Sequence, residues 1–160
     1  ALSADGLVKD AAVSSPAPTE VVVAVLSHTG DGTADATLLA AVEAALTGVD
    51  VRPLADQVTV QAATIITYTI NATLTVYADA DQSTTQTNAE SALGAWVIAQ
   101  HKIGRDITVA GIHAALKVEG VHDIALNNTV GTDLIANQVV TDTEAAYCDG
   151  ITVNVGGVGE

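Results

Sequence analysis

Aromatic and basic residues are scarce in this sequence of 160 residues. It has no Phe, one Trp and three Tyr, so there are few aromatic side chains on which the bases of single-stranded nucleic acid could stack. Five Lys and Arg stand against 19 Asp and Glu, which gives a formal net charge of −14. Because binding to phosphate groups needs clustered Lys and Arg, this balance argues against nucleic acid and against anionic membrane surfaces as partners.

The sequence also lacks long hydrophobic runs and paired cysteines. Hydrophobic residues make up 49% of it, yet no run reaches the roughly 18 residues that a membrane-spanning helix needs. No basic region precedes an apolar stretch at the N-terminus, so we predict no secretory signal. Cys148 is the single cysteine and cannot form an internal disulfide. Synthesis in a reducing cytoplasm is therefore expected.

The first part of the chain has the pattern of two strands. They are expected at residues 7–14 and 19–27. The second contains a β-branched run from Glu20 to Leu26, which is typical of a strand buried on both faces.

A helix and a short strand are predicted next. Thr33 or Asp35 is expected to cap a helix that runs to about Thr47 and ends at Gly48, and a short strand is expected from Gln57 to about Val60. The side chains predicted to share the apolar face of this helix are Leu38, Leu39, Val42, Ala45 and Leu46.

The stretch from Thr64 to Tyr77 alternates with a period of two, which is a strong strand signal. One face is expected to be buried and the other to be polar. The predicted buried side chains are Ile66, Tyr68, Ile70, Ala72, Leu74 and Val76. The predicted polar ones are Thr67, Thr69, Asn71, Thr73 and Thr75.

Two helices are predicted after this strand. Ser83 or Thr84 is expected to open a helix that runs to His101, and a second helix spans residues 109–118 with Gly120 as its C-terminal cap. The first of them is expected to pack on the buried strand face through Leu93, Trp96 and Val97.

Further strands are expected near residues 121–127 and 150–155, and the stretch 128–149 reads as polar and less regular. Strands and helices are segregated rather than strictly alternating, which predicts an α+β fold of mostly antiparallel sheet with helices packed on one side. We predict two small modules: a strand-strand-helix-strand module over residues 1–62 and a strand-helix-helix-strand module over residues 63–160.

A short internal sequence similarity leads to a prediction about the N-terminus. Residues 1–10 and 115–123 share the pattern A-L-x-x-acid-G followed by V-x-D. The first copy has one additional residue between these two parts. The second copy is predicted as the end of a helix that turns into a strand. By analogy Ala1 would lie in the last turn of a helix that begins upstream, so we expect the first module to be N-terminally truncated. The absence of Met fits this expectation.

The candidate sites all have simpler structural interpretations. Gly30-Asp31-Gly32 precedes a helix, but a phosphate-binding Walker loop also needs a Lys, and no Lys is near. A backbone turn is the favoured role. The pairs Asp31 and Asp35, and Asp79 and Asp81, lack the spacing of a calcium-binding EF-hand, so loop and cap roles are favoured for them.

The histidines and the cysteine form no recognisable catalytic or metal-binding pattern. No two of His28, His101, His113 and His122 have the HExxH spacing. Cys148 follows the apolar residues of Ala145-Ala146-Tyr147, and a buried, unreactive thiol is favoured over a nucleophile. We therefore predict no catalytic residue, cofactor-binding residue or metal ligand, and no enzyme activity.

Several stretches, in the family's order, resemble the baseplate J family of contractile-tailed phages. They are Val23-Ala24-Val25-Leu26-Ser27 with Gly30-Asp31-Gly32-Thr33, Asp50-Val51-Arg52-Pro53-Leu54-Ala55-Asp56-Gln57-Val58-Thr59-Val60-Gln61, Gly104-Arg105-Asp106-Ile107, His113-Ala114-Ala115-Leu116-Lys117-Val118-Glu119-Gly120-Val121 and Ala145-Ala146-Tyr147-Cys148. The family extends well upstream, so the resemblance implies that this chain is roughly a C-terminal half.

The resemblance implies a structural component of a baseplate wedge, located in the virion tail and made in the cytoplasm of the bacterial host. Its implied partners are other baseplate and tail proteins, including copies of itself, around the tail hub. No cofactor is implied. Because like copies with a charge of −14 repel each other, we expect the chain alone to be monomeric or weakly oligomeric. The alternative is a small ligand-binding or surface-binding module of a tail-like device, which predicts a concave pocket with convergent polar groups.

Overall fold

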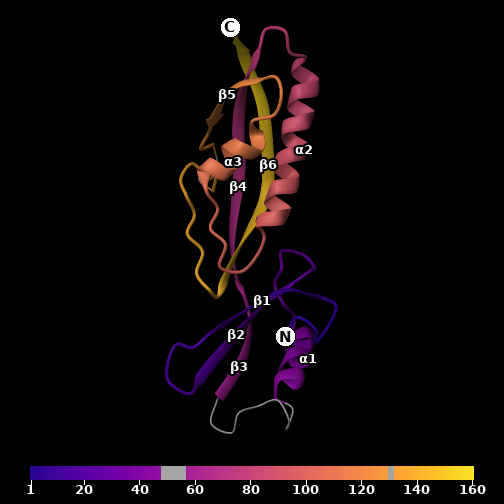
Figure 1. Ribbon diagram of the computed structural model, residues 1–160, viewed down its shortest axis with the longest axis vertical. Helices are drawn as coiled ribbons and strands as arrows, with labels where there is room; N and C mark the ends of the chain where they lie inside the picture. The colour runs from indigo at the N-terminus through magenta and orange to yellow at the C-terminus, as the bar shows by residue number, and fades with distance from the viewer. Residues whose placement is uncertain (48–56, 130–131) are drawn as a thin grey trace. The chain divides into compact units, whose positions relative to one another are not determined.

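The structure is a computed structural model that describes residues 1–47, 57–129 and 132–160 (Figure 1). The predicted helix stop at Gly48 and most of the Asp50–Gln61 stretch lie outside the described residues. The elements, in chain order, are β1 (Val8–Ser14), β2 (Glu20–Ser27), α1 (Ala36–Leu46), β3 (Gln57–Ala62), β4 (Thr64–Tyr77), α2 (Gln82–Gln100), α3 (Val109–Leu116), β5 (Val121–Leu126) and β6 (Glu144–Gly159).

The chain forms two compact units, and each combines separate segments of the sequence. The first unit holds residues 1–66, 102–105 and 140–147. The second holds residues 67–101, 106–139 and 148–160. The predicted modules, 1–62 and 63–160, did not anticipate the two later segments that join the first unit.

The first unit is built on the sheet β1-β2-β3, with β2 in the centre. β2 pairs antiparallel with β1 and parallel with β3. Val23 to Ser27 are all buried, as predicted for a strand covered on both faces. One face packs against α1 through Leu38 and Val42, whereas Ala45, predicted for the same helix face, is exposed.

The other face of this sheet has a small core of its own. Leu26 and Ala63 are buried there together with Ala145 from the start of β6, and Ile65 and Ile103 pack against them. The carboxylate Oδ2 of Asp10 accepts a hydrogen bond from the backbone N–H of Ile103 at 3.1 Å. The later segments are therefore part of the first unit's hydrophobic core.

The second unit is built on the sheet β5-β4-β6, with β4 in the centre. The alternation predicted for β4 is confirmed, because every second side chain from Tyr68 to Val76 is buried. β5 pairs antiparallel with β4. β6 runs parallel to β4, since Gly150 lies against Thr69 and Gly156 lies against Thr73. The α+β class is confirmed, but each sheet is mixed rather than mostly antiparallel.

The first helix of the second unit is capped by a residue other than those predicted, whereas α3 begins at Val109 as predicted. Asp81, not Ser83 or Thr84, caps α2, because its Oδ1 accepts a hydrogen bond from the backbone N–H of Thr84 at 2.7 Å. Thr108 caps α3 in the same way. α3 ends with Lys117 as its C-cap, so the predicted capping role of Gly120 is wrong.

The stretch 128–149, predicted to be irregular, contains ordered backbone pairing. Next to Thr69, the residues around Asp133 pair with β4 in the position that β5 occupies further along this strand. The N–H of Thr69 donates to the carbonyl of Thr132, and the N–H of Leu134 donates to the carbonyl of Thr69. Ile107 and Gln138 exchange both backbone hydrogen bonds, at 3.0 and 2.8 Å. β6 begins at Glu144, several residues before the predicted strand.

Trp96 lies half-buried against α3. A Cβ at Gly111 would lie 2.6 Å from the Trp96 ring. Gly111→Ala is therefore expected to destabilise the chain by about 1–3 kcal/mol, although Ala normally stabilises a helix by about 1 kcal/mol relative to Gly. Urea denaturation measures this. In a Trp96→Ala background the same substitution should become neutral or stabilising, and an unchanged loss there would contradict the proposed contact.

Candidate assembly surfaces

The Gly30-Asp31-Gly32 segment forms the turn between β2 and α1. Gly30 and Gly32 have φ of 59° and 96°, a left-handed backbone that favours glycine. Asp31 Oδ1 accepts a hydrogen bond from the N–H of Thr33 at 2.9 Å. These contacts are those of a backbone turn, in line with the favoured interpretation.

The remaining candidate aspartates end or begin elements. Asp35 Oδ1 accepts from the N–H of Leu38 at 2.8 Å and caps α1. Asp81 caps α2, and its hydrogen bonds with Thr84 lower the pKa of its carboxyl group. Asp79 is exposed in the turn before α2. The carboxylates of Asp35 and Asp81 thus have defined structural partners.

Two of the four histidines, His113 and His122, line one cavity between α3 and β5, and the other two lie elsewhere. His28 is exposed after β2, and His101 is buried at the C-cap of α2. His113 is in the last turn of α3. The ring of His122 meets that of Tyr77 edge to face, with centroids 5.1 Å apart. Within the described ranges, no group of three or more His, Cys, Asp or Glu side chains is arranged to hold a metal ion.

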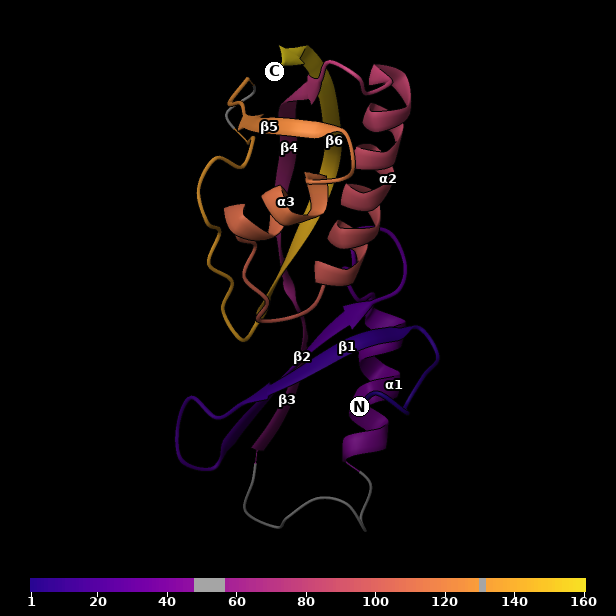
Figure 2. The ribbon, with the colours of Figure 1, turned by 45° about the horizontal axis from the view of Figure 1, so that its top comes forward.

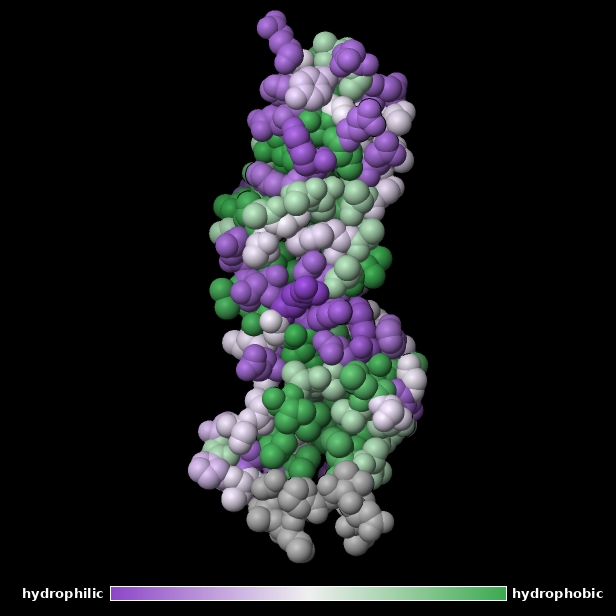
Figure 3. Space-filling view, in the orientation of Figure 1, coloured by the Kyte–Doolittle hydropathy of each residue, from purple (hydrophilic) through white to green (hydrophobic). Residues whose placement is uncertain are grey.

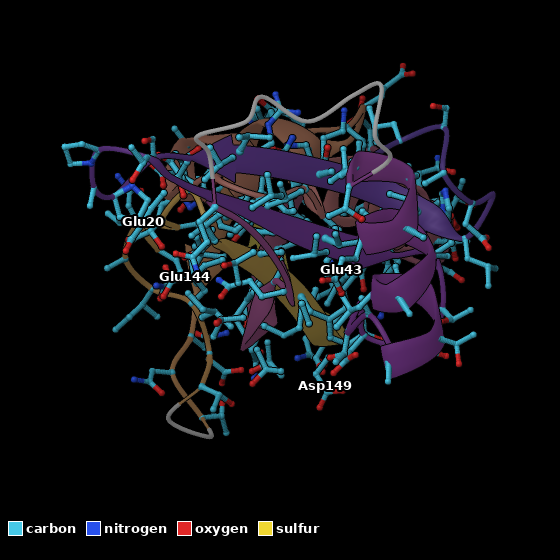
Figure 4. All side chains as sticks on the ribbon, turned by 90° about the horizontal axis from the view of Figure 1, so that it is seen from below. Glu20, Glu43, Glu144 and Asp149 are labelled. Atoms are coloured by element: carbon cyan, nitrogen blue, oxygen red, sulfur yellow. The ribbon has the colours of Figure 1, made fainter. Side chains whose placement is uncertain are left out.

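The acidic residues of the first unit are spread over different elements. Figure 4 labels Glu20 at the start of β2, Glu43 on α1 and Glu144 at the start of β6. Glu144 Oε2 accepts hydrogen bonds from both the N–H and the hydroxyl of Thr141, and these bonds lower its carboxyl pKa. Its contacts are therefore local to the turn before β6.

Cys148 is partly buried in β6. Its Sγ–H donates to the carbonyl of Gly150 at 3.3 Å. Burial raises the thiol pKa to about 11. Burial also raises the pKa of Tyr68, and the nearby Cys148 makes a smaller contribution in the same direction.

We therefore expect Cys148 to react slowly with iodoacetamide near pH 8, where about one thiol in a thousand is ionised. The rate should keep rising up to about pH 11, because the thiolate is the reactive form. Mass spectrometry of the alkylated chain measures the rate. A plateau of the rate below pH 8 would instead indicate an activated nucleophile.

Two cavities of the second unit are relevant to the ligand-binding alternative. One of about 360 Å³ lies between α3 and β5 and is lined by residues including His113, Lys117 and Asp123. The other, of about 470 Å³, lies where β4 leads into α2 and includes Asp79 and Glu119. In the second cavity, the carboxylate of Asp81 already caps α2.

The second sheet has one face turned away from α2 and α3, which lie beside each other on its other side (Figures 1 and 2). We call this the open face. Period two and the strand pairing assign its members, because Gly150 and Gly156 point toward the β4 threonines and Asp123 and Ala125 lie opposite Thr75 and Thr73. They are Thr67, Thr69, Asn71, Thr73, Thr75, Tyr77, Asp123, Ala125, Gly150, Thr152, Asn154, Gly156 and Val158.

Polar side chains of the open face are hydrogen-bonded within the unit. Thr69 donates to Asp133 Oδ1 at 2.7 Å, and Asp133, which is 7% exposed, also accepts from the N–H of Thr129. Asn71 donates to Thr129 Oγ1 at 2.7 Å, and Asn127 donates to Thr73 Oγ1 at 2.8 Å. The alternation of β4 predicted a polar face, but nothing in the sequence indicated that Asp133 would hold it.

Both outer strands of the second sheet have backbone acceptors occupied by side chains. The ammonium group of Lys117 donates to the carbonyls of Val121 and His122 on β5 at 2.6 Å each. Gln86 of α2 donates to the carbonyl of Val153 on β6 at 2.7 Å. Side chains that engage an outer strand in this way oppose the addition of another strand.

Large hydrophobic side chains are exposed in several parts of the chain. In the first unit Leu2, Leu7 and Val13 are exposed, and Figure 3 shows hydrophobic residues gathered around the strands and α1 of this unit. On the face of the second unit shown there, hydrophilic and hydrophobic residues are mixed. No helix among the described residues is long and apolar enough to cross a membrane.

Comparison with known proteins identifies a family and a relative. The family model described as Baseplate J-like protein C-terminal domain matches residues 68–154. Baseplate protein J of Escherichia phage P2 is 44% identical to this chain over 158 residues, or 99% of the chain. The aligned part is 51% of that relative, so the chain spans about half the length of the protein that it matches.

Proposed function

Because the chain belongs to the family of Baseplate J-like protein C-terminal domains, we propose that it is a structural component of a phage tail baseplate. The observation that carries the proposal is the 44% identity, which extends over nearly the whole chain, to Baseplate protein J. A structural role agrees with the site chemistry, since the candidate aspartates with known contacts serve turns and caps.

In finer terms, we place the chain in a baseplate wedge. There it would contact copies of itself and neighbouring baseplate and tail proteins around the tail hub. Rings of this kind are built from contacts that are individually weak, because closure of the ring and the neighbouring proteins add stability. The proposed location is the virion tail, after synthesis in the cytoplasm of the bacterial host.

Immunoelectron microscopy of tails from cells that carry the gene tests the location. Antibodies raised against the chain should label the baseplate end of the tail, and labelling should disappear when the antibodies are first absorbed with the purified chain. Labelling of the head or along the tail tube would refute the proposal.

Disruption of the gene separates the structural role from the ligand-binding alternative. A structural component should be needed for assembly, so disruption should give tails without complete baseplates. A surface-binding module should leave complete tails that fail to adsorb to cells. The second result would replace the proposed function with the alternative.

A further inference from the structure

The charge of the chain limits which surfaces two copies could share. With a net charge of −14, most contacts between copies bring carboxylates together, and such contacts are repulsive at low salt. Among the residues assigned to the open face, Asp123 on the outer strand β5 carries a charge, and the carboxylate of Asp133, which accepts from Thr69, is nearly buried. The centre of the open face is formed by Thr, Asn and Gly, so two copies can meet there with little repulsion.

The polar groups of the open face are also suited to burial. A polar group that loses water without a partner costs free energy, but Thr69, Asn71 and Thr73 already have partners within the unit at 2.7 to 2.8 Å. The glycines keep this surface low, since a Cβ at Gly156 would lie 2.4 Å from the methyl group of Thr73. The centre of the open face is thus a surface of short side chains, and three of its polar side chains on β4 already have hydrogen-bond partners.

One end of the open face carries larger side chains. Tyr77 is 41% exposed and Val158 is 53% exposed. The ring of His122 is in contact with Tyr77 and lies close to Gly159, next to Val158. Interfaces typically combine a few aromatic and aliphatic anchors with polar but uncharged neighbours, and the open face has such anchors at one end.

The edges of the sheet are less suited to self-association than its face. Lys117 and Gln86 occupy backbone acceptors of β5 and β6, which hinders growth of the sheet by strand addition. A sheet face of short side chains can be covered by another sheet, and two sheets pack face to face about 10 Å apart. The simplest complementary surface is the same face of another copy, related by a two-fold axis.

We propose that the open face packs against the open face of a second copy of this chain. The inference rests on the proposed function, for which it names the surface used in self-association. The strand spacing limits the buried area to about 500 Å² per copy, or about 1,000 Å² in total, near the lower limit for a specific interface. The contact should therefore be weak in isolation, as the charge also predicts.

A pair of charge variants tests the proposal. Thr152→Asp adds a negative charge to the exposed part of the open face, whereas Ser91→Asp adds the same charge to an exposed position on α2. Sedimentation equilibrium at high protein concentration and raised salt should show weak dimers of the unaltered chain. Thr152→Asp should weaken dimerisation at least tenfold, and Ser91→Asp less than twofold. Equal effects of the two variants would overturn the proposal.

Cross-linking provides a second measurement that does not depend on a new charge in a strand. In a Cys148→Ser background, Thr152→Cys and Ser91→Cys place one thiol at each position, and a short bis-maleimide is added. Covalent dimers should form from Thr152→Cys and exceed those from Ser91→Cys. Equal yields, or a chain that stays monomeric at every concentration, would refute the inference, while the location of the protein in the baseplate is tested separately by the labelled tails.

Discussion

Leu93→Ala is expected to lower the free energy of unfolding by about 3 kcal/mol, within the range of 2–5 kcal/mol for truncation of a buried leucine. Leu93 lies on α2 and its side chain is fully buried. The loss has two causes: the removed methyl groups no longer leave water on folding, and the surrounding side chains close the resulting cavity only partly. Urea denaturation followed by circular dichroism measures the change.

Ile98 offers a matched control on the same helix. Its side chain is 72% exposed, so Ile98→Ala removes little buried surface and should change the free energy of unfolding by less than about 0.5 kcal/mol. Both substitutions introduce the same residue into α2, and their difference isolates the effect of burial. A loss for Leu93→Ala no larger than that for Ile98→Ala would contradict the position of Leu93 in the core.

Gly120→Ala should destabilise the chain by about 2–5 kcal/mol. Gly120 has a φ of 88°, and an alanine in a left-handed backbone costs about 1–2 kcal/mol. A Cβ there would also lie 2.6 Å from the hydroxyl of Thr85, a buried residue of α2. Either the turn before β5 or the start of α2 would have to move, which adds about 1–3 kcal/mol.

Gly94→Ala is the control for this substitution. Gly94 lies within α2, and a Cβ there meets nothing within 4 Å. This variant should be stabilised by about 1 kcal/mol, because alanine favours helix more than glycine does. Thermal unfolding of both variants measures opposite shifts. A stable Gly120→Ala variant would show that the turn at Gly120 can relax without strain.

The sequence predicted the regular elements well where the pattern was local. The alternation of β4 and the β-branched run of β2 depend on residues next to each other, and both strands were confirmed. The caps were less certain because Asp81, Ser83 and Thr84 can all accept hydrogen bonds from backbone N–H groups. Only the backbone conformation before α2 decides that Asp81 does so.

Features that depend on distant residues could not be predicted. The start of β6 is a run of small and polar residues without clear alternation, and its position depends on pairing with residues 103–104 and on burial of Ala145 beside Leu26. The contact of Trp96 with α3 depends in the same way on Gly111, which a local pattern does not relate to Trp96. The polar alternation of β4 predicted the face, whereas its hydrogen bonds with Asp133 join residues far apart in the chain.

The small core formed by Leu26, Ala63 and Ala145 has a consequence for the order of events during translation. Leu26 and Ala63 leave the ribosome long before Ala145 is made. The first unit therefore cannot complete this core while the nascent chain ends before β6, even though β1, β2, α1 and β3 have emerged. Closing such a long loop also costs entropy and slows folding. The first unit is thus completed only after Ala145 at the start of β6 has been made.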